Sequence, residues 1–552
     1  MAARPTLLSR WAPAGLSRRT YLPEAASGCR ACQARHLTQR RFNSAALSHP
    51  VPAQDHGQQP STSSYLRYGQ PLPSTHPHLL APGELTPGIQ ADEYEQRRRR
   101  LIQHLEPGAV VVIASARLKY ATGKIFYKFR QDSNFWYLTG WEEPDSALVL
   151  EKDTSQRGYR MTMFVRSRDA HDEVWNGPRS GKEGATEVFG ADEAVDITLL
   201  PARLRSILDK RSGGDASVYV DVEGVQHGSR SRNRQPKLSL FDYLVPSGRA
   251  LDDAEEVASI LSGSGRRVKS ASQEFEKLRL VKSAAEIKVL RKAADISADA
   301  HAKVMRFCEP TSTSGKTEAS LVAHFEYQTA LANSARPAYV PVCASGSSSL
   351  TIHYISNQLQ LQDGDLVVLD AGCEWGGYAS DITRTFPVSG RFSSAQRDLY
   401  EALLRVHREC IKLCTENEGY SMEQLHRRSV DLMRAELTKL GFDMRGGELE
   451  RILYPHFLTH PLGIDLHDTP GFSRSRPIQS GMVITIEPGI FVPPLSQFPK
   501  AFHGLSVRVE DEVLVQRDTS VVLSVDAPKE VADVEACFLY DKNKYSDKKK
   551  RH

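Results

Sequence analysis

Five acidic or imidazole side chains interrupt strand-like apolar segments in the last third of this 552-residue chain. They are Asp370, Asp381, His460, Glu487 and Glu510, in the segments LVVLDAGCEWGGYASDITRTFP, LTHPLGIDLHD, GMVITIEPGIF and GLSVRVEDEV. An ionised carboxylate is costly to remove from water unless an opposite charge accompanies it. If the five side chains converge, a pair of divalent metal ions can supply that charge. The pattern therefore predicts a two-metal hydrolase.

The two aspartates of this set are expected to lie side by side. Asp370 ends the apolar run LVVLD, and Asp381 follows after a segment, AGCEWGG, that is rich in glycine, as a tight return of the chain requires. A hairpin would bring the two carboxylates together, and their repulsion favours a cation between them. The alternative, a solvated turn residue, fits Asp363 and Asp365 better than it fits these two.

The two glutamates also follow or interrupt strand-like runs. Glu487 comes after VITI and before Pro488-Gly489, and Glu510 lies in SVRVEDEV. Strand alternation places Glu510 and Arg508 on the same face of their segment. Alone, each glutamate would be an ordinary strand carboxylate. Their recurrence in the same setting as the aspartates indicates a shared site.

Histidines are concentrated in one short segment. His456, His460 and His467 fall close together, and the first two have the i, i+4 spacing of one helix face. Because Pro461 would end a helix there, the pair is expected at a bend. An oxygen-rich ligand set with one imidazole favours Mn²⁺ or a similar ion over a cysteine-lined structural zinc site.

The amino-terminal segment differs in charge from the remainder of the chain. Residues 1–42 contain eight arginines and one acid, Glu24, and so carry +7, which leaves −3 for the rest of a chain of net charge +4. This leader is rich in Arg, Ala, Ser and Leu, which predicts a mitochondrial transit peptide processed before Asn43; a disordered basic tail is the alternative. The mildly acidic remainder argues against nucleic-acid binding. No apolar run approaches the roughly 20 residues that span a bilayer.

Composition and periodicity divide the rest of the chain. Residues 43–82 are rich in Pro, Ser, His and Gln and are expected to form a flexible linker. Alternating strand and helix patterns predict one α/β domain over 83–265 and a second over 271–535, followed by a basic tail over 536–552. The expected elements include a helix at 93–105 with solvated arginines, two strands within 135–152, and helices at 286–308, 317–333, 394–414 and 422–437.

These segments resemble a known family of metallopeptidases. DAG…SDITRTFP, HPLGIDLHD, TIEPGI and VRVEDEV are similar to motifs of the family that includes methionine aminopeptidase, prolidase and aminopeptidase P. GELTPG, YKFRQDSNFWYLTGWEEPDSALVLEK, VWNGPRSGKEGA, LRLVKSAAEIKVLRKA and ARPAYVPVCASGSSSLTIHY resemble aminopeptidase P in particular. The resemblance covers about residues 83–535. It implies an aminopeptidase P amino-terminal domain followed by a catalytic domain of the pseudo-symmetric α/β pita-bread fold.

The resemblance also implies a metal role for each of the five residues. Asp370 would hold one ion, Asp381 and Glu510 would bridge two, and His460 and Glu487 would complete the second site. Glu487 would also accept the proton of the attacking hydroxide. The implied cofactor is a pair of divalent ions of the Mn²⁺ kind.

Four further residues match positions that surround the substrate in the family. His353 would support the tetrahedral intermediate, His467 would lie near the scissile bond, and Arg508 would support the substrate pocket. His456 matches a histidine that lies behind the metal ligands. Two family positions differ here, Phe491 in place of tyrosine and Pro461 in place of an aromatic residue, which affects the expected substrate preference and not the metal ligands.

Together these features predict a mitochondrial metalloaminopeptidase, in the matrix or at the inner-membrane periphery. It would remove one N-terminal residue from peptides or from imported proteins after presequence cleavage, and the resemblance implies a homo-oligomer, a dimer or tetramer. A general X-Pro aminopeptidase and a prolidase-like dipeptidase share the same metal motifs and remain alternatives. A pita-bread binding protein without catalysis is the alternative outside the enzymes, and the intact set of five residues argues against it.

Overall fold

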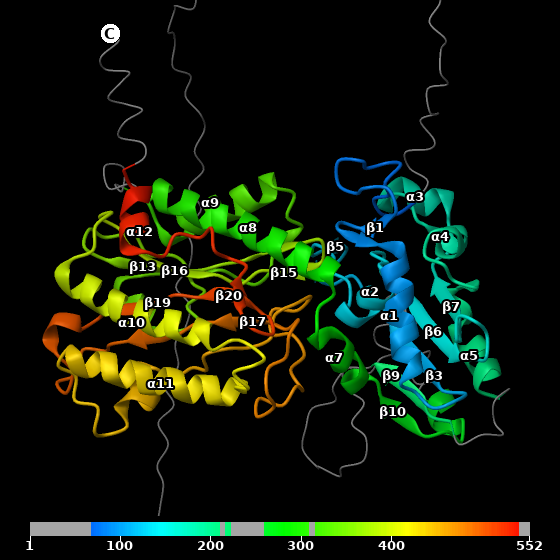
Figure 1. Ribbon diagram of the computed structural model, residues 1–552. Helices are drawn as coiled ribbons and strands as arrows, with labels where there is room; N and C mark the ends of the chain where they lie inside the picture. The colour runs from blue at the N-terminus through cyan, green and yellow to red at the C-terminus, as the bar shows by residue number, and fades with distance from the viewer. Residues whose placement is uncertain (1–67, 210–215, 222–258, 309–314, 540–552) are drawn as a thin grey trace, which may run out of the picture. The chain divides into compact units, whose positions relative to one another are not determined.

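The computed structural model describes residues 68–209, 216–221, 259–308 and 315–539 (Figure 1). The predicted transit peptide, residues 1–42, lies outside this part of the chain. The predicted linker ends earlier than expected. Leu72 and Leu80 are buried, and the side chain of Gln70 donates a hydrogen bond of 3.0 Å to the carbonyl of Gly140. The chain is therefore packed well before residue 83, because these apolar side chains find partners in the domain that follows.

The amino-terminal domain is built on a six-stranded mixed sheet with strand order β10-β9-β3-β6-β7-β8. The strands are β3 (Val110–Ala114), β6 (Ala147–Lys152), β7 (Tyr159–Val165), β8 (Glu193–Asp196), β9 (Val218–Asp221) and β10 (Val268–Ser270). β3 runs parallel to β9 and antiparallel to β6. Since β10 is part of this sheet, the domain extends past the predicted boundary at 265.

Helices cover both faces of the six-stranded sheet. Leu101 and Ile102 of α1 (Ala91–Gln103) share a core with Val111 of β3, whereas Leu204 of α5 (Leu200–Asp209) shares another core with Val112. Alternate residues of β3 therefore point to opposite helical layers. Smaller elements complete the domain: β1 (Glu84–Thr86), β2 (Ile89–Gln90), β4 (Tyr120–Thr122), β5 (Ile125–Phe126), α3 (Ala170–Asn176) and α4 (Gly181–Glu187).

Two expectations for this domain are wrong. The segment expected to begin with a strand at Phe135 forms a helix, α2 (Ser133–Thr139), in which the Asp132 side chain caps the amide of Phe135 at 2.8 Å. The arginines of α1 are not all solvated, because Arg97 and Arg98 are buried. Their guanidinium groups donate to carbonyls at the end of α2, at 3.2 Å for Tyr137 and 2.6 Å for Leu138.

The carboxy-terminal domain contains the four long helices that the sequence predicted. They are α8 (Ala284–Phe307), α9 (Glu318–Leu331), α10 (Ser394–Lys412) and α11 (Met422–Lys439). Two shorter helices, α7 (Ser272–Leu280) and α12 (Val531–Cys537), were not predicted. Thr317, the first residue of the helix expected at 317–333, caps α9 and accepts the amide of Ser320 at 3.2 Å. α12 extends the packed domain into the predicted basic tail, since Cys537 and Phe538 are buried.

Two small antiparallel sheets form the centre of the catalytic domain (Figure 1). One has the order β12-β13-β16 and the other β17-β20-β21. Figure 1 shows α8 and α9 on one side of this strand layer and α10 and α11 on the other. The strands are β12 (Val342–Ser345), β13 (Leu366–Asp370), β16 (Thr383–Pro387), β17 (Val483–Ile486), β20 (Asp511–Val515) and β21 (Ser520–Val522), with shorter pairs formed by β11 (Arg336–Pro337), β14 (Cys373–Trp375), β15 (Tyr378–Ala379), β18 (Gly489–Phe491) and β19 (Ser506–Arg508).

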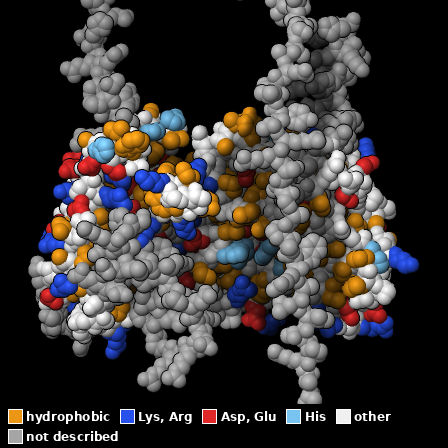
Figure 2. All heavy atoms as spheres, turned by 180° about the vertical axis from the view of Figure 1, so that it is seen from behind, with side chains coloured by type: hydrophobic (Ala, Val, Ile, Leu, Met, Phe, Trp, Pro, Cys, Tyr) orange, Lys and Arg blue, Asp and Glu red, His pale blue; other side chains and the backbone are white. Residues whose placement is uncertain are grey.

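The histidine-rich segment lies in an irregular part of the chain. A short π-helix spans Leu449–Leu453, and the residues from Tyr454 to His460 are not helical. The i, i+4 spacing of His456 and His460 therefore does not place them on a helix, because the chain bends at Tyr454, His456 and Leu458 before it reaches Pro461. Figure 2 shows a face on which histidine side chains lie among hydrophobic ones.

Candidate metal centre

Strand pairing brings the five predicted residues together from distant parts of the chain. Asp370 is the last residue of β13 and pairs with Thr383 at the start of β16, just after Asp381. The amide of Glu510 donates to the carbonyl of Thr383 at 3.1 Å, which joins the second sheet to the first.

The remaining two predicted ligands, His460 and Glu487, are held by backbone bonds at and beside β17. The amide of Glu487 donates to the carbonyl of Leu458 at 2.9 Å, and the amide of Thr485 donates to the carbonyl of His460 at 3.0 Å. These backbone bonds fix His460 next to the end of β17. The predicted convergence of the five residues is therefore present in the fold.

The side chains of the five residues meet at short distances. His460 Nε2 lies 3.3 Å from Asp381 Oδ2 and 3.7 Å from Glu487 Oε1. One donor atom from each of Asp381, His460 and Glu510 lies within 4.8 Å of the others. Asp370 joins this group through Tyr339, whose hydroxyl lies 2.5 Å from Asp370 Oδ1 and 2.8 Å from Asp381 Oδ1.

Burial and mutual repulsion give the acids unusual proton affinities. Burial raises the pKa of Glu487 to about 8, and burial together with the charge of Asp381 raises the pKa of Glu510 well above its ordinary value. Burial also raises the pKa of Asp370, although Arg508 opposes this shift. Burial lowers the pKa of His460, but Asp381 and Glu487 outweigh that effect and raise it to about 9. The acids thus require added positive charge to remain ionised at neutral pH, and oxygen donors with one imidazole fit a pair of divalent ions.

A layer of polar residues behind the acids holds their carboxylates in place. Arg508 donates to Asp370 Oδ2 at 2.5 Å and to Thr383 Oγ1 at 3.1 Å, and Thr383 in turn donates to Glu510 at 2.6 Å. Arg508 therefore contacts a predicted metal ligand as well as the cavity.

Sequence reasoning assigned no role to three residues of this layer. Tyr339 contacts both aspartates, Thr383 joins Arg508 to Glu510, and Glu512 accepts the amide of Asp381 at 2.9 Å. All three lie inside quoted segments, ARPAYV, DITRTF and VRVEDEV. Thr383 and Glu512 each stand two residues after a predicted ligand, which was the available signal. Tyr339 had no such signal, because it lies 31 residues before Asp370.

The site opens into a cavity of about 530 Å³. The side chains of His353 and His467 are exposed and line this cavity. All five predicted ligands also line it: Asp370, Asp381, His460, Glu487 and Glu510. Val340, Ile355 and Leu466 add an apolar wall. A cavity with acids on one side and apolar side chains on another can receive a cationic amine next to a hydrophobic group.

The other predicted site residues lie around this cavity. His467 stacks edge-on against His460 with 4.4 Å between ring centroids, and burial lowers the pKa of His467. His456 Nδ1 lies 3.8 Å from Glu487 Oε2, and burial lowers the pKa of His456 to about 3. Pro461 lines the cavity, whereas Phe491 packs edge-on against His456 at 5.7 Å.

Family models match most of the described chain. Residues 288–517 match metallopeptidase family M24, and residues 94–216 match the aminopeptidase P N-terminal domain. The two matched segments correspond to the two domains of the fold.

Individual relatives match over nearly their whole length. Intermediate cleaving peptidase 55 from Saccharomyces cerevisiae is 39% identical over 85% of this chain and 88% of its own. Xaa-Pro aminopeptidase 3 from Homo sapiens is 37% identical over 92% of this chain and 95% of its own. A third relative, from Arabidopsis thaliana, is named "Intermediate cleaving peptidase 55, mitochondrial" and is 37% identical over 86% of this chain and 88% of its own.

Known structures agree with the fold and with the kind of site. The crystal structure of Icp55 from Saccharomyces cerevisiae superposes with a TM-score of 0.70 at 36% identity, over 82% of this chain and 98% of that one. A zinc-substituted Escherichia coli aminopeptidase P in complex with product gives a TM-score of 0.71 at 30% identity, over 82% and 99% of the two chains. The chain belongs to metallopeptidase family M24, with an aminopeptidase P N-terminal domain, and is a metalloaminopeptidase.

Proposed function

We propose that this metalloaminopeptidase acts in mitochondria, where it removes one N-terminal residue from imported proteins after their presequence has been cleaved. The observation that carries the proposal is the convergence of four carboxylates and one imidazole on the wall of a cavity that is also apolar. Support for the mitochondrial setting comes from the arginine-rich leader and from the name of the Arabidopsis relative.

The proposed metal ligands are the five residues of the site, with two ions of the Mn²⁺ kind. Asp370 would hold one ion, Asp381 and Glu510 would bridge, and His460 and Glu487 would complete the second site. When bound, such ions polarise a carbonyl group and lower the pKa of water. The donor set fits them because its buried acids require positive charge and it contains no thiolate.

The proposed catalytic residues act on protons and on the developing oxyanion. Glu487 would accept a proton from the attacking water, since its carboxylate lies on the cavity wall and can hold a proton near neutral pH. His353 and His467 would donate hydrogen bonds to the tetrahedral intermediate and the leaving group. Arg508 would hold Asp370 and shape the pocket.

The cavity also accounts for removal of a single residue. A free α-amino group is cationic and would be attracted to the acids, whereas the side chain of the first residue would contact Val340, Ile355 and Leu466. A peptide bound by its amine presents only its first peptide bond to Glu487. We therefore expect blocked N-termini to be poor substrates and large apolar first residues to be good ones.

Peptides of defined length test this proposal. Purified protein with added Mn²⁺ is incubated with a ten-residue peptide beginning Tyr-Ala, its Tyr-Pro counterpart, an N-acetylated copy of each, and the dipeptide Tyr-Pro. Release of one tyrosine from the free ten-residue peptides, and none from the acetylated copies, is expected. Cleavage of the dipeptide alone would favour a prolidase-like enzyme, and cleavage of the Tyr-Pro peptide alone would favour a general X-Pro aminopeptidase. No cleavage and no bound divalent ion would favour a binding protein.

The cellular role needs a separate measurement. The N-termini of mitochondrial proteins are compared between cells with and without this enzyme. A set of matrix proteins should be longer by one residue when the enzyme is absent. Unchanged N-termini would contradict the processing role even if the purified protein cleaves peptides.

A homo-oligomer, a dimer or tetramer, is also part of the proposal. Val174 and Trp175 on α3 are 80% and 77% exposed, and a subunit contact at this helix would cover them. Within the described residues, no helix is long and apolar enough to cross a membrane. Sedimentation of the purified chain measures the oligomeric state directly.

A further inference from the structure

The position of His467 is set by its loop and not by bonds to its ring. Among the residues that the structure describes, the His467 ring makes an edge contact with His460 and no hydrogen bond. Its loop, residues 461–470, includes Thr469 at a φ of 46°, a left-handed conformation that is rare for a β-branched residue. Such backbone strain persists only where surrounding contacts enforce it.

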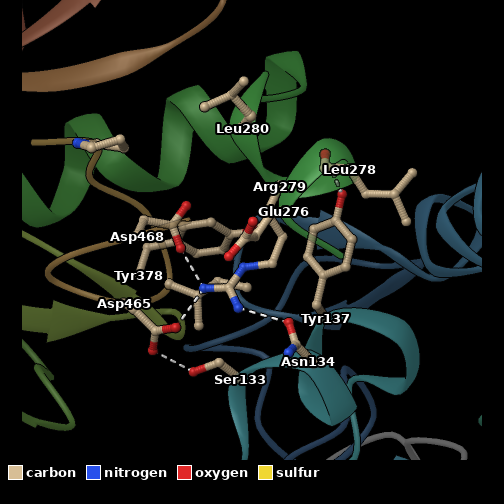
Figure 3. Close-up of polar contacts among 12 residues, drawn as sticks. Ser133, Asn134, Tyr137, Glu276, Leu278, Arg279, Leu280, Tyr378, Asp465 and Asp468 are labelled. Carbon is tan, nitrogen blue, oxygen red and sulfur yellow. Dashed lines mark hydrogen bonds and ion pairs between the residues drawn. The ribbon is translucent and has the colours of Figure 1, made fainter. Parts of the chain in front are cut away.

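Two buried cations provide those contacts on one side of the loop. Asp468, which directly follows His467, is 1% exposed. Its carboxylate accepts a hydrogen bond from Arg279 of α7 (Figure 3). It accepts a second one from Lys282 Nζ at 2.9 Å. Arg279 also donates to Asp465 Oδ2 at 2.6 Å. One guanidinium group thus holds the loop on both sides of His467.

The loop sequence makes room for this pair of charges. A Cβ atom on Gly463 would lie 2.5 Å from Asp468 Oδ2 and 3.2 Å from the Cε atom of Lys282. Any larger residue at Gly463 would displace the carboxylate from its cations. The glycine is therefore required by the ion pair and not by the backbone, since Gly463 has no positive φ.

Arg279 and Asp465 also contact α2 of the amino-terminal domain. Arg279 Nη1 donates to Asn134 Oδ1 at 2.7 Å, and Ser133 Oγ donates to Asp465 at 2.5 Å (Figure 3). Tyr137 of the same helix donates to the carbonyl of Leu278 in α7 at 3.2 Å. Arg279 therefore connects α2 to the loop that carries His467.

We propose that Arg279 is a positioning residue for His467, acting through Asp465 and Asp468, and that the amino-terminal domain contributes to catalysis through this contact. The inference rests on the proposed function, in which His467 acts on the substrate. A displacement of about 1 Å at a catalytic group can lower the rate by about a hundredfold. Loss of the Arg279 contacts would release the strained loop and displace His467, and this displacement would lower the rate of catalysis.

A double-mutant cycle between Arg279 and His467 tests the link. Arg279→Met should lower kcat by about 10- to 100-fold with little change in KM. In a His467→Ala background the same substitution should have no further effect, because the group that Arg279 positions is then absent. An equal fold-loss in both backgrounds would show that Arg279 acts only on general structure and would overturn the proposal.

Conservative and milder variants keep the test decisive if Arg279→Met does not fold. Asp465→Asn weakens the anchor at a partly exposed position and leaves Asp468 with both cations, so it is placed in the same cycle with the same expectation. Arg279→Lys should restore part of kcat, since an ammonium group can bind one carboxylate but not both. Arg291→Met is the matched control, because Arg291 pairs with Asp295 on the surface of α8, and it should leave kcat unchanged.

Metal binding separates this inference from the proposed function. Calorimetric titration of Mn²⁺ into the Arg279→Met protein should match the wild type, because none of the five proposed ligands is altered. A loss of metal binding would contradict a role through His467. If wild-type protein releases no amino acid, the proposed function is wrong. If the wild type is active and His467→Ala is equally active, His467 does not act on the substrate and the inference fails with it. If His467→Ala is impaired but the effects of the two substitutions are additive, only the Arg279 link is contradicted.

Discussion

The hydroxyl of Tyr339 lies 2.5 Å from Oδ1 of Asp370, at the edge of the proposed metal centre. The same hydroxyl is 2.8 Å from Asp381, yet it has one proton to donate. Two carboxylates therefore share one donor, and burial together with their charge raises the pKa of Tyr339 well above its ordinary value. The hydroxyl remains protonated and serves as the neutral partner of two acids.

Removal of this hydroxyl should destabilise the metal-free protein. Tyr339→Phe is expected to lower the free energy of unfolding by about 1–2 kcal/mol in the presence of a chelator, since hydrogen bonds to charged groups contribute on that order. With Mn²⁺ the loss should be smaller, because the ions neutralise the acids. Urea unfolding with and without metal measures both values. Tyr400→Phe is the control, since Tyr400 donates to the carbonyl of Lys529 at 2.7 Å and the stability lost on its removal should not depend on metal. If Tyr339→Phe loses the same free energy of unfolding with and without metal, the prediction is contradicted.

The proposed proton acceptor gives a second prediction. Glu487→Gln keeps the shape of the side chain but removes its capacity to accept a proton, so the rate of amino-acid release should fall by about 10²- to 10⁴-fold. Release is measured with the ten-residue Tyr-Ala peptide, and bound metal is measured by elemental analysis. Full activity with metal bound would show that Glu487 is not the proton acceptor.

The elements that sequence predicted well have strong local signals. α8, α10 and α11 are long, periodic and capped, as with Ser393, which caps Gln396 at the start of α10. α9 has the cap but no distinct apolar face. α2 was missed because nearly all of its residues are buried, so its apolar run has no helical period and resembles a strand. Its helical state is set by the cap at Asp132 and by Gly140, which ends it at a φ of 67°.

The candidate site was predicted to a similar extent and for similar reasons. The five proposed ligands are visible because each polar residue interrupts an apolar run. Arg279 and Lys282 are not visible, because a charged side chain beside a helix end is normally solvated, and their carboxylate partner Asp468 is 189 and 186 residues away. Only the folded chain shows that these charges are buried together.

A buried histidine makes the stability of the catalytic domain depend on pH. His301 on α8 is 0% exposed and contacts the carbonyl of Ala371 at 2.9 Å, and burial lowers its pKa to about 3. Below pH 6.5, the ordinary pKa of a histidine, the unfolded chain therefore binds a proton at His301 more readily than the folded chain does. The contribution of His301 is present above pH 6.5 and is lost as the pH falls toward 3.

His301→Gln should reduce this dependence. Between pH 6.5 and 5 the wild-type protein should lose about 1–2 kcal/mol more free energy of unfolding than the variant. Urea unfolding of chelated protein at several pH values provides the comparison, and His104→Gln, at the exposed end of α1, is the control. Parallel pH profiles for wild type and His301→Gln would contradict the assignment.

The buried ion pair between Arg384 and Asp511 gives the last prediction. Both side chains are 0% exposed and lie 2.7 Å apart, on β16 and β20, the strands that begin just after Asp381 and Glu510. Arg384 also donates to the carbonyl of Glu510 at 2.5 Å. Because removal of Arg384 leaves the buried carboxylate of Asp511 without one of its two cationic partners, Arg384→Met should cost about 3–5 kcal/mol of stability.

The second cation beside Asp511 limits that loss and makes the prediction specific. Lys529 Nζ lies 2.5 Å from the other oxygen of Asp511, so Lys529→Met combined with Arg384→Met should cost more than the sum of the single changes. Arg99→Met is the control, because Arg99 pairs with Glu95 on the exposed face of α1 at 2.7 Å and should cost less than about 1 kcal/mol. Guanidinium unfolding of the wild type and the four variants gives these values. If Arg384→Met loses no more free energy of unfolding than Arg99→Met, the Arg384–Asp511 pair does not stabilise the strands beside the proposed metal ligands. The site would then be held by the backbone bonds between β13, β16 and the chain at Glu510 alone.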